Sequence, residues 1–183
     1  MNSLQQTLAL GVPISWPKWL ISTSLFLVLA LVLPIGFHQI GMSGRIFLPM
    51  HIPPLLAGFL AGPISGIVVG ILAPALSHLI NGMPPSYAVP LMSVELAVYG
   101  LVAGMAFYKL RLNIFIALLT AMIVGRIMFG VTLFFLGLFV EMPYTAAAWF
   151  STAGAMVTGW PGVLVQLAMI PLIVIGAKKS KLV

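Results

Sequence analysis

Cysteine is absent from this chain of 183 residues, and acidic residues are almost absent, with only Glu95 and Glu141 present. The lack of cysteine excludes disulfides, thiolate metal sites and cysteine nucleophiles. Charged residues of both signs make up 5% of the chain and hydrophobic residues 62%, whereas charged residues make up about 25% of a soluble domain. The composition therefore predicts a single membrane domain over residues 1–183, with the lipid bilayer as its solvent.

Sequence motifs of catalysis are also missing. The chain contains no phosphate-binding loop, no His-Glu-x-x-His motif and no nucleophile elbow. We therefore expect no enzyme activity, no cofactor and no metal site. The formal charge of +6 does not predict a nucleic-acid partner, because the basic residues are few and flank apolar segments.

Six apolar segments predict an all-α integral membrane protein with six transmembrane helices. The expected spans are about residues 20–40, 53–62, 63–80, 87–108, 112–140 and 151–177. The second is short, because Pro53 and Pro54 favour a helix start and Gly62-Pro63 a break. The second and third spans together also fit one re-entrant hairpin, since about 20 residues are needed to cross the hydrocarbon core. We favour two separate spans.

The basic residues give the orientation of these spans. A cytoplasmic N-terminus leaves only Arg45 outside and puts the other basic residues that flank the spans inside: Lys18, Lys109, Arg111, Lys178, Lys179 and Lys181. The positive-inside rule therefore predicts that both termini are cytoplasmic, in a multi-pass protein of the cell membrane.

Ionisable residues inside the spans mark a candidate site. Glu95 lies in the fourth span and Arg126 in the fifth, and such groups face the bundle interior or a cavity. At a rise of about 1.5 Å per residue, both lie roughly 20 Å from the cytoplasmic ends, and His78 of the third span comes out at a similar height. Further polar or aromatic residues are expected near this level: Asn81, Tyr99, Thr132, Trp160 and Gln166.

The loop of residues 41–52 carries Arg45 and His51 and is expected to lie over this polar level. The pattern predicts a pocket open to the exterior, because the cytoplasmic halves of the spans offer few polar side chains to line a pore. Structural roles remain alternatives: Glu95 and Arg126 as an ion pair that locks two helices, His51 as a packed loop residue, and Trp160 as an interfacial anchor.

Several motifs together resemble one transporter family. They are FLPMHIPPLLAGFLAGP at residues 47–63, NGMPP at 81–85, ELAVYG at 95–100 and Gly-Arg at 125–126. With the length and the span count, they resemble the substrate-binding S component of energy-coupling factor (ECF) vitamin transporters.

The resemblance implies a prokaryotic six-helix protein that binds a vitamin or vitamin precursor on its outer side, beneath the first loop. It implies as partners a transmembrane coupling protein and two cytoplasmic ATPases, which hydrolyse the ATP. One departure concerns docking on the coupling protein. The family often carries an Ala-x-x-x-Ala pattern in the first span, which this chain lacks. Docking through other small residues, including those of segment 57–62, and pairing with a specific module are the two alternatives.

The class of ligand stays open at this point. A carboxylate would suit Arg126 or Arg45, an amine would suit Glu95, and a zwitterion would suit both charges. The remaining alternative is that Glu95 and Arg126 pair only with each other and contact no ligand. We favour a small carboxylate- or hydroxyl-bearing vitamin precursor.

Three other functions remain to be compared with an S component. A stand-alone secondary transporter or small channel needs coupling groups along a path, and the sequence offers almost none. A membrane-embedded enzyme would depend on His78, Glu95 and Arg126 alone, and a structural scaffold needs no ligand. Association with two ATPases and a coupling protein separates the S component from all three.

Overall fold

The computed structural model describes residues 16–39, 44–143, 145, 147–148 and 159–180. Within them, five helical segments are long and apolar enough to cross a membrane: Trp16–Phe37, Pro63–Asn81, Ala88–Lys109, Ile114–Gly137 and Trp160–Lys179. They belong to helices α2 (Trp16–Gln39), α5 (Pro63–Asn81), α6 (Ala88–Gly104) with its π-helical end η2 (Met105–Lys109), α7 (Ile114–Gly137) and α10 (Trp160–Lys179). The chain is therefore a multi-pass, all-helical bundle over the part that the structure describes.

Three short elements occupy the predicted first loop and second span. They are α3 (Gly44–Phe47), the 3-10 turn η1 (Pro49–His51) and α4 (Ile52–Ala61). Leu48 adopts a left-handed conformation with φ 50° just before η1, and Pro53 and Pro54 lie in the first turn of α4. With ten residues, α4 is shorter than the roughly 20 needed to cross the hydrocarbon core. A sixth span thus stays a prediction.

Glycines let α4, α5 and α6 pack backbone against backbone. A Cβ at Gly100 of α6 would overlap the backbone of Gly66 in α5, and one at Gly58 of α4 would overlap Gly100. Close approach at small residues is how helices associate in lipid, where burial of apolar surface gives no driving force. Because Ala57 is fully buried and Gly58 meets Gly100, these two residues are not available to dock a coupling protein, contrary to the docking alternative for segment 57–62.

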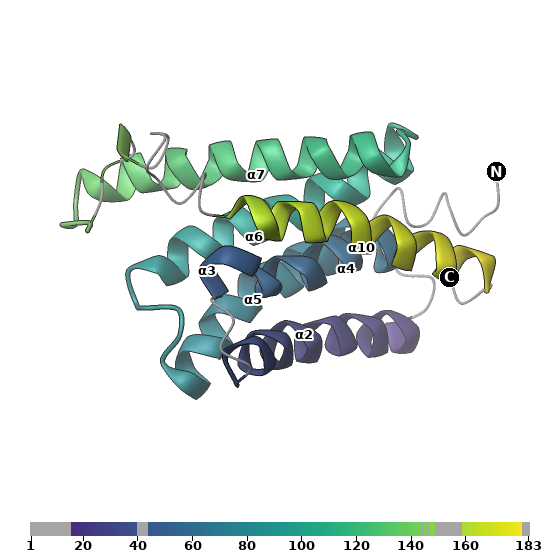
Figure 1. The fold of residues 1–183 in the computed structure, drawn as a ribbon, viewed down its shortest axis with the longest axis horizontal. Coiled ribbons are helices and arrows are strands. Elements are labelled where there is room, and N and C mark those ends of the chain that lie inside the picture. The colour runs from purple at the N-terminus through teal and green to yellow at the C-terminus, as the bar shows by residue number, and fades with distance from the viewer. Residues whose placement is uncertain (1–15, 40–43, 144, 146, 149–158, 181–183) are drawn as a thin grey trace.

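The helices run up and down in one bundle, so that their ends gather at two opposite faces (Figure 1). The start of α2 and the end of α10 lie at the right-hand face in this view, with the turn between α6 and α7. In that turn, Asn113 caps α7 by accepting a hydrogen bond from the Ile116 backbone N–H at 2.8 Å.

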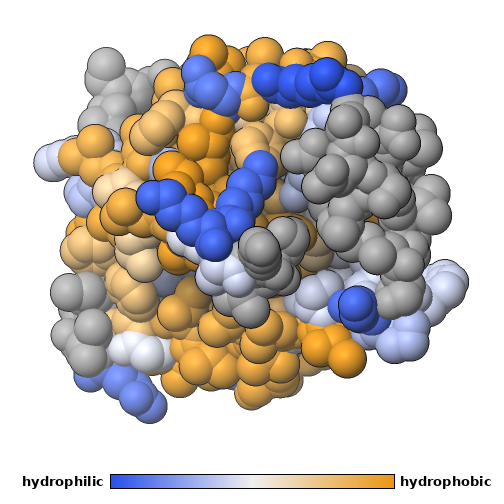
Figure 2. Space-filling model, turned by 90° about the vertical axis from the view of Figure 1, so that its right-hand side faces the viewer, coloured by the Kyte–Doolittle hydropathy of each residue, from blue (hydrophilic) through white to orange (hydrophobic). Residues whose placement is uncertain are grey.

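This right-hand face carries the described basic residues at helix ends: Lys18, Lys109, Arg111, Lys178 and Lys179. Figure 2 views it directly and shows hydrophilic side chains spread across it among hydrophobic ones. We call it the basic face, and the face at the other end of the bundle, where α3 lies and α4, α6 and α10 begin, the opposite face.

Candidate functional site

Glu95 of α6 and Arg126 of α7 meet inside the bundle, as their positions within spans predicted. Arg126 Nη1 lies 3.0 Å from Glu95 Oε1, and the two residues are only 8% and 1% exposed. Glu95 lies seven residues from the start of α6, which puts it about 10 Å below the opposite face. The pair therefore joins two helices in the half of the bundle away from the basic face.

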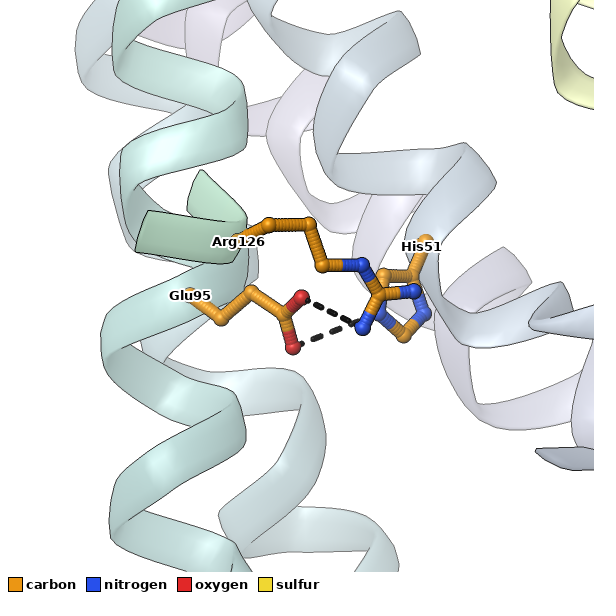
Figure 3. Close-up of polar contacts among 3 residues, drawn as sticks. All are labelled: His51, Glu95 and Arg126. Carbon is orange, nitrogen blue, oxygen red and sulfur yellow. Dashed lines mark ion pairs between the residues drawn. The ribbon is translucent and has the colours of Figure 1, made fainter. Parts of the chain in front are cut away.

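His51 approaches the same carboxylate from a third helix. It is the last residue of η1 and caps the start of α4, and its side chain is 3% exposed. His51 Nε2 lies 3.5 Å from Glu95 Oε2, longer than a normal hydrogen bond. Figure 3 shows the Arg126 and His51 side chains directed toward Glu95 from their separate helices. Residues distant in sequence thus converge on one carboxylate.

Tyr99 completes this cluster one helical turn after Glu95. Its ring centroid lies 5.5 Å from that of His51, and its side chain is 1% exposed. The ring fits between α6 and α7 because position 125 is glycine, and a Cβ at Gly125 would overlap it. We call Glu95, Arg126, His51 and Tyr99 the polar cluster.

Charge in the polar cluster is largely compensated within it. Burial of a carboxylate or a guanidinium in apolar surroundings is costly unless each finds an opposite charge and hydrogen bonds. Glu95 and Arg126 supply such a pair. The arrangement suits recognition of a ligand by hydrogen bonds, and it also links α6 firmly to α7 and α4.

His78 and Asn81 lie apart from the polar cluster, in the last turn of α5. His78 Nδ1 is 2.8 Å from the Pro84 carbonyl oxygen, and Asn81 Oδ1 accepts from the Met83 backbone N–H at 2.9 Å. His78 is three residues from the end of α5, hence closer to the opposite face than Glu95. The common level predicted for His78, Glu95 and Arg126 therefore holds for the last two. A substrate-binding role of His78 or Asn81 stays a prediction.

Three other residues named from the sequence, Trp160, Thr132 and Arg45, lie on three different helices. Trp160, at the start of α10, is 60% exposed, as expected of an interfacial anchor. Thr132 donates its hydroxyl hydrogen to the Met128 carbonyl of its own helix at 2.7 Å. Arg45 belongs to α3.

Gln166 of α10 was expected only as a neighbour of the polar level, and the structure makes it more prominent. It is fully buried, and neither its amide oxygen nor its amide nitrogen has a hydrogen-bond partner in the described part of the chain. The sequence signal is a lone amide side chain inside an apolar span. Unsatisfied buried polar atoms of this kind are rare and need an explanation.

Comparison with known proteins gives one assignment. The family model described as "ECF transporter, substrate-specific component" matches residues 18–175. Neither the curated proteins nor the solved structures include a match. The family match covers nearly the whole described bundle, including every residue of the polar cluster. The chain therefore belongs to the substrate-specific components of ECF transporters, which are transport subunits rather than enzymes.

Proposed function

We propose that this protein is the specificity subunit of an ECF-type importer of the prokaryotic plasma membrane, and that it binds a vitamin or vitamin precursor next to the polar cluster. The observation that carries the proposal is the convergence of Glu95, Arg126 and His51 from α6, α7 and α4, all buried in the half of the bundle below the opposite face. Polar residues inside a membrane bundle are costly, so their usual roles are functional.

The distribution of basic residues indicates from which side of the membrane the ligand binds. The basic face fits the cytoplasmic side, because positive residues are retained there. The opposite face is then extracellular, and a ligand enters between α3, η1 and the beginning of α6. Both termini are cytoplasmic in this arrangement.

Transport then depends on partners. The family assignment implies association with the ECF module, which comprises a coupling protein and ATPases. In our proposal two cytoplasmic ATPases hydrolyse ATP while this chain supplies only the specificity for the ligand.

Purification of the tagged full-length chain from its own membranes in mild detergent tests this function. We expect a coupling protein and two ATPases to co-purify, and native mass spectrometry to show a retained molecule of vitamin size. A chain that carries neither partner subunits nor ligand, and that adds no ATP-dependent uptake when co-expressed with the module, would contradict the proposal.

A matched pair of variants tests the location of the ligand. Arg126→Ala should weaken binding of the retained molecule more than tenfold, because loss of a charge-assisted hydrogen bond costs about 1.5–3 kcal/mol. Lys179→Ala, at the exposed end of α10, is the control and should bind as the wild type does. Equal affinity of a folded Arg126→Ala variant would remove Arg126 from the site.

A further inference from the structure

Gln166 has the full hydrogen-bonding capacity of a primary amide and uses none of it within the described part of the chain. It is 0% exposed, and Ile170 and Val174, which follow it on the same face of α10, are equally buried and belong to the hydrophobic core. An amide left without partners in such surroundings destabilises the protein. A ligand that supplies the missing partners would account for its presence.

Gln166 and His51 each lie four residues beyond the contact between α10 and α3. Gly162 packs on the backbone carbonyls of Ile46 and Phe47 in α3, and Gln166 lies one turn further along the same face, about 6 Å deeper in the bundle. His51 follows Phe47 by four residues, at the end of η1. Since α10 contacts α4 and α7, the helix that carries Gln166 lies beside the helix that His51 caps and the helix that carries Arg126.

His51 also has unused hydrogen-bonding capacity. Neither ring nitrogen makes a hydrogen bond within the described residues, and the carboxylate oxygen Glu95 Oε2 lies 3.5 Å from Nε2. A neutral imidazole offers one donor and one acceptor. Gln166 and His51 together thus present two donor groups and two acceptors.

The charge balance of the polar cluster limits the ligand that this arrangement suits. Because Glu95 and Arg126 form a pair at 3.0 Å, a charged ligand would bring a net charge into an apolar interior without a free counter-charge from that pair. A carboxylate would also face the Gln166 oxygen, and an ammonium would leave that oxygen satisfied but not the amide N–H groups. A cis-amide edge, with an N–H beside a C=O, matches both atoms of a glutamine amide.

We propose that Gln166, with His51, recognises an uncharged ligand through an amide-type edge, such as that of a lactam, a cyclic urea or a primary carboxamide. This inference rests on the proposed function in taking the bundle interior as the ligand site. The sequence favoured a carboxylate- or hydroxyl-bearing precursor, and the inference departs from the carboxylate because the structure pairs Arg126 with Glu95.

The experiment compares the full-length protein and its variants in detergent. The probes are lactams, cyclic ureas and carboxamides of vitamin size, each with a carboxylate and an amine analogue of the same skeleton, tested by thermal shift and isothermal titration calorimetry. We expect the tightest probe to be an uncharged amide, bound at least tenfold tighter than either of its analogues. A carboxylate or amine as the tightest probe, or no binding by any probe, would overturn the inference.

Gln166→Met keeps the volume of the side chain and removes the amide. We expect the tightest probe to bind at least tenfold more weakly to this variant, while the melting temperature without ligand is the same or higher than that of the wild type. That combination separates a ligand contact from a structural role, because loss of a structural hydrogen bond lowers the melting temperature. Unchanged affinity, or a lower melting temperature with unchanged affinity, would overturn the inference.

Thr120→Val is the matched control. It also removes one polar group from a span, but the Thr120 hydroxyl is satisfied by the Ile116 carbonyl of its own helix at 2.8 Å. Its affinity for the probe should equal that of the wild type. If a charged ligand binds and the ATPases still co-purify, the amide inference fails while the transport function stands.

Discussion

The ring of Tyr99 in α6 occupies the space next to Gly125 in α7 that any larger residue at position 125 would need. Gly125 directly precedes Arg126, and Tyr99 follows Glu95 by one turn. The contact therefore fixes the distance between α6 and α7 at the height where the ion pair forms. It links a packing requirement to the geometry of the polar cluster.

Gly125→Ala should destabilise the protein and disturb the polar cluster together. The added Cβ overlaps the Tyr99 ring, which is 1% exposed and has little room to move. Overpacking of this kind costs about 1–3 kcal/mol. Thermal unfolding in detergent, followed by tryptophan fluorescence, measures the effect. Gly137→Ala in the same helix meets nothing within 4 Å and is the control. Equal melting temperatures for the two variants would contradict the packing argument.

Removal of one partner of the Glu95–Arg126 pair should cost more stability than removal of both. Arg126→Met leaves Glu95 buried without its closest positive partner, and loss of one member of a buried pair costs about 3–5 kcal/mol. Glu95→Gln with Arg126→Met leaves no charge behind and should recover much of that loss. Denaturant or thermal unfolding of the wild type, both single variants and the double variant gives the coupling free energy. Additive losses would show that the two side chains act independently.

His51→Ala should shorten the residence time of the bound ligand. His51 ends η1 and caps the start of α4, on the side from which we propose that the ligand enters, and it is buried beside Glu95 and Tyr99. Loss of its ring opens this side of the site and removes a hydrogen-bonding group. The dissociation rate of the ligand identified by mass spectrometry, measured by surface plasmon resonance on captured protein, is expected to rise. The same rate in wild type and variant would argue against a role of His51 in retention.

A buried hydrogen bond between Thr23 of α2 and Ser65 of α5 should contribute modestly to stability. The two hydroxyl oxygens are 2.7 Å apart, and both residues are buried. Such bonds between membrane helices average about 0.6 kcal/mol. A double-mutant cycle with Thr23→Val and Ser65→Ala measures the coupling free energy. A coupling of several kcal/mol would mean that these hydroxyls hold the bundle together, and we expect that glycine packing does so instead.

Local properties of the sequence were sufficient for the membrane class and for most helix positions. The helices α2, α5, α6, α7 and α10 overlap the segments expected from hydropathy and length, with bounds that differ by several residues at some ends. The Asn113 cap and the prolines at the start of α4 are local signals as well. The short α4 shows the limit of such signals, because its composition is that of a span while its length is not.

The contacts of the site required the tertiary structure. The sequence placed Glu95 and Arg126 in spans and at one height, but whether they pair depends on which sides of α6 and α7 face each other. His51 joins them because η1 and α4 enter the bundle, and His78 instead contacts the Pro84 carbonyl in the turn that follows α5. That the buried Gln166 amide has no hydrogen-bond partner in the described part of the chain is likewise a property of the packed bundle.

The sequence by itself determined that this chain is a helical membrane protein, roughly where its long apolar helices lie and which helix ends are basic. Only the tertiary structure decided which polar side chains meet and which have no partner. The physical reason is that lipid is as apolar as the bundle interior, so a span that is hydrophobic all round carries no pattern to show which face is buried. Close packing at Gly58, Gly66, Gly100 and Gly125 determines which helix faces meet. The residues of the polar cluster lie on those faces and are therefore brought together.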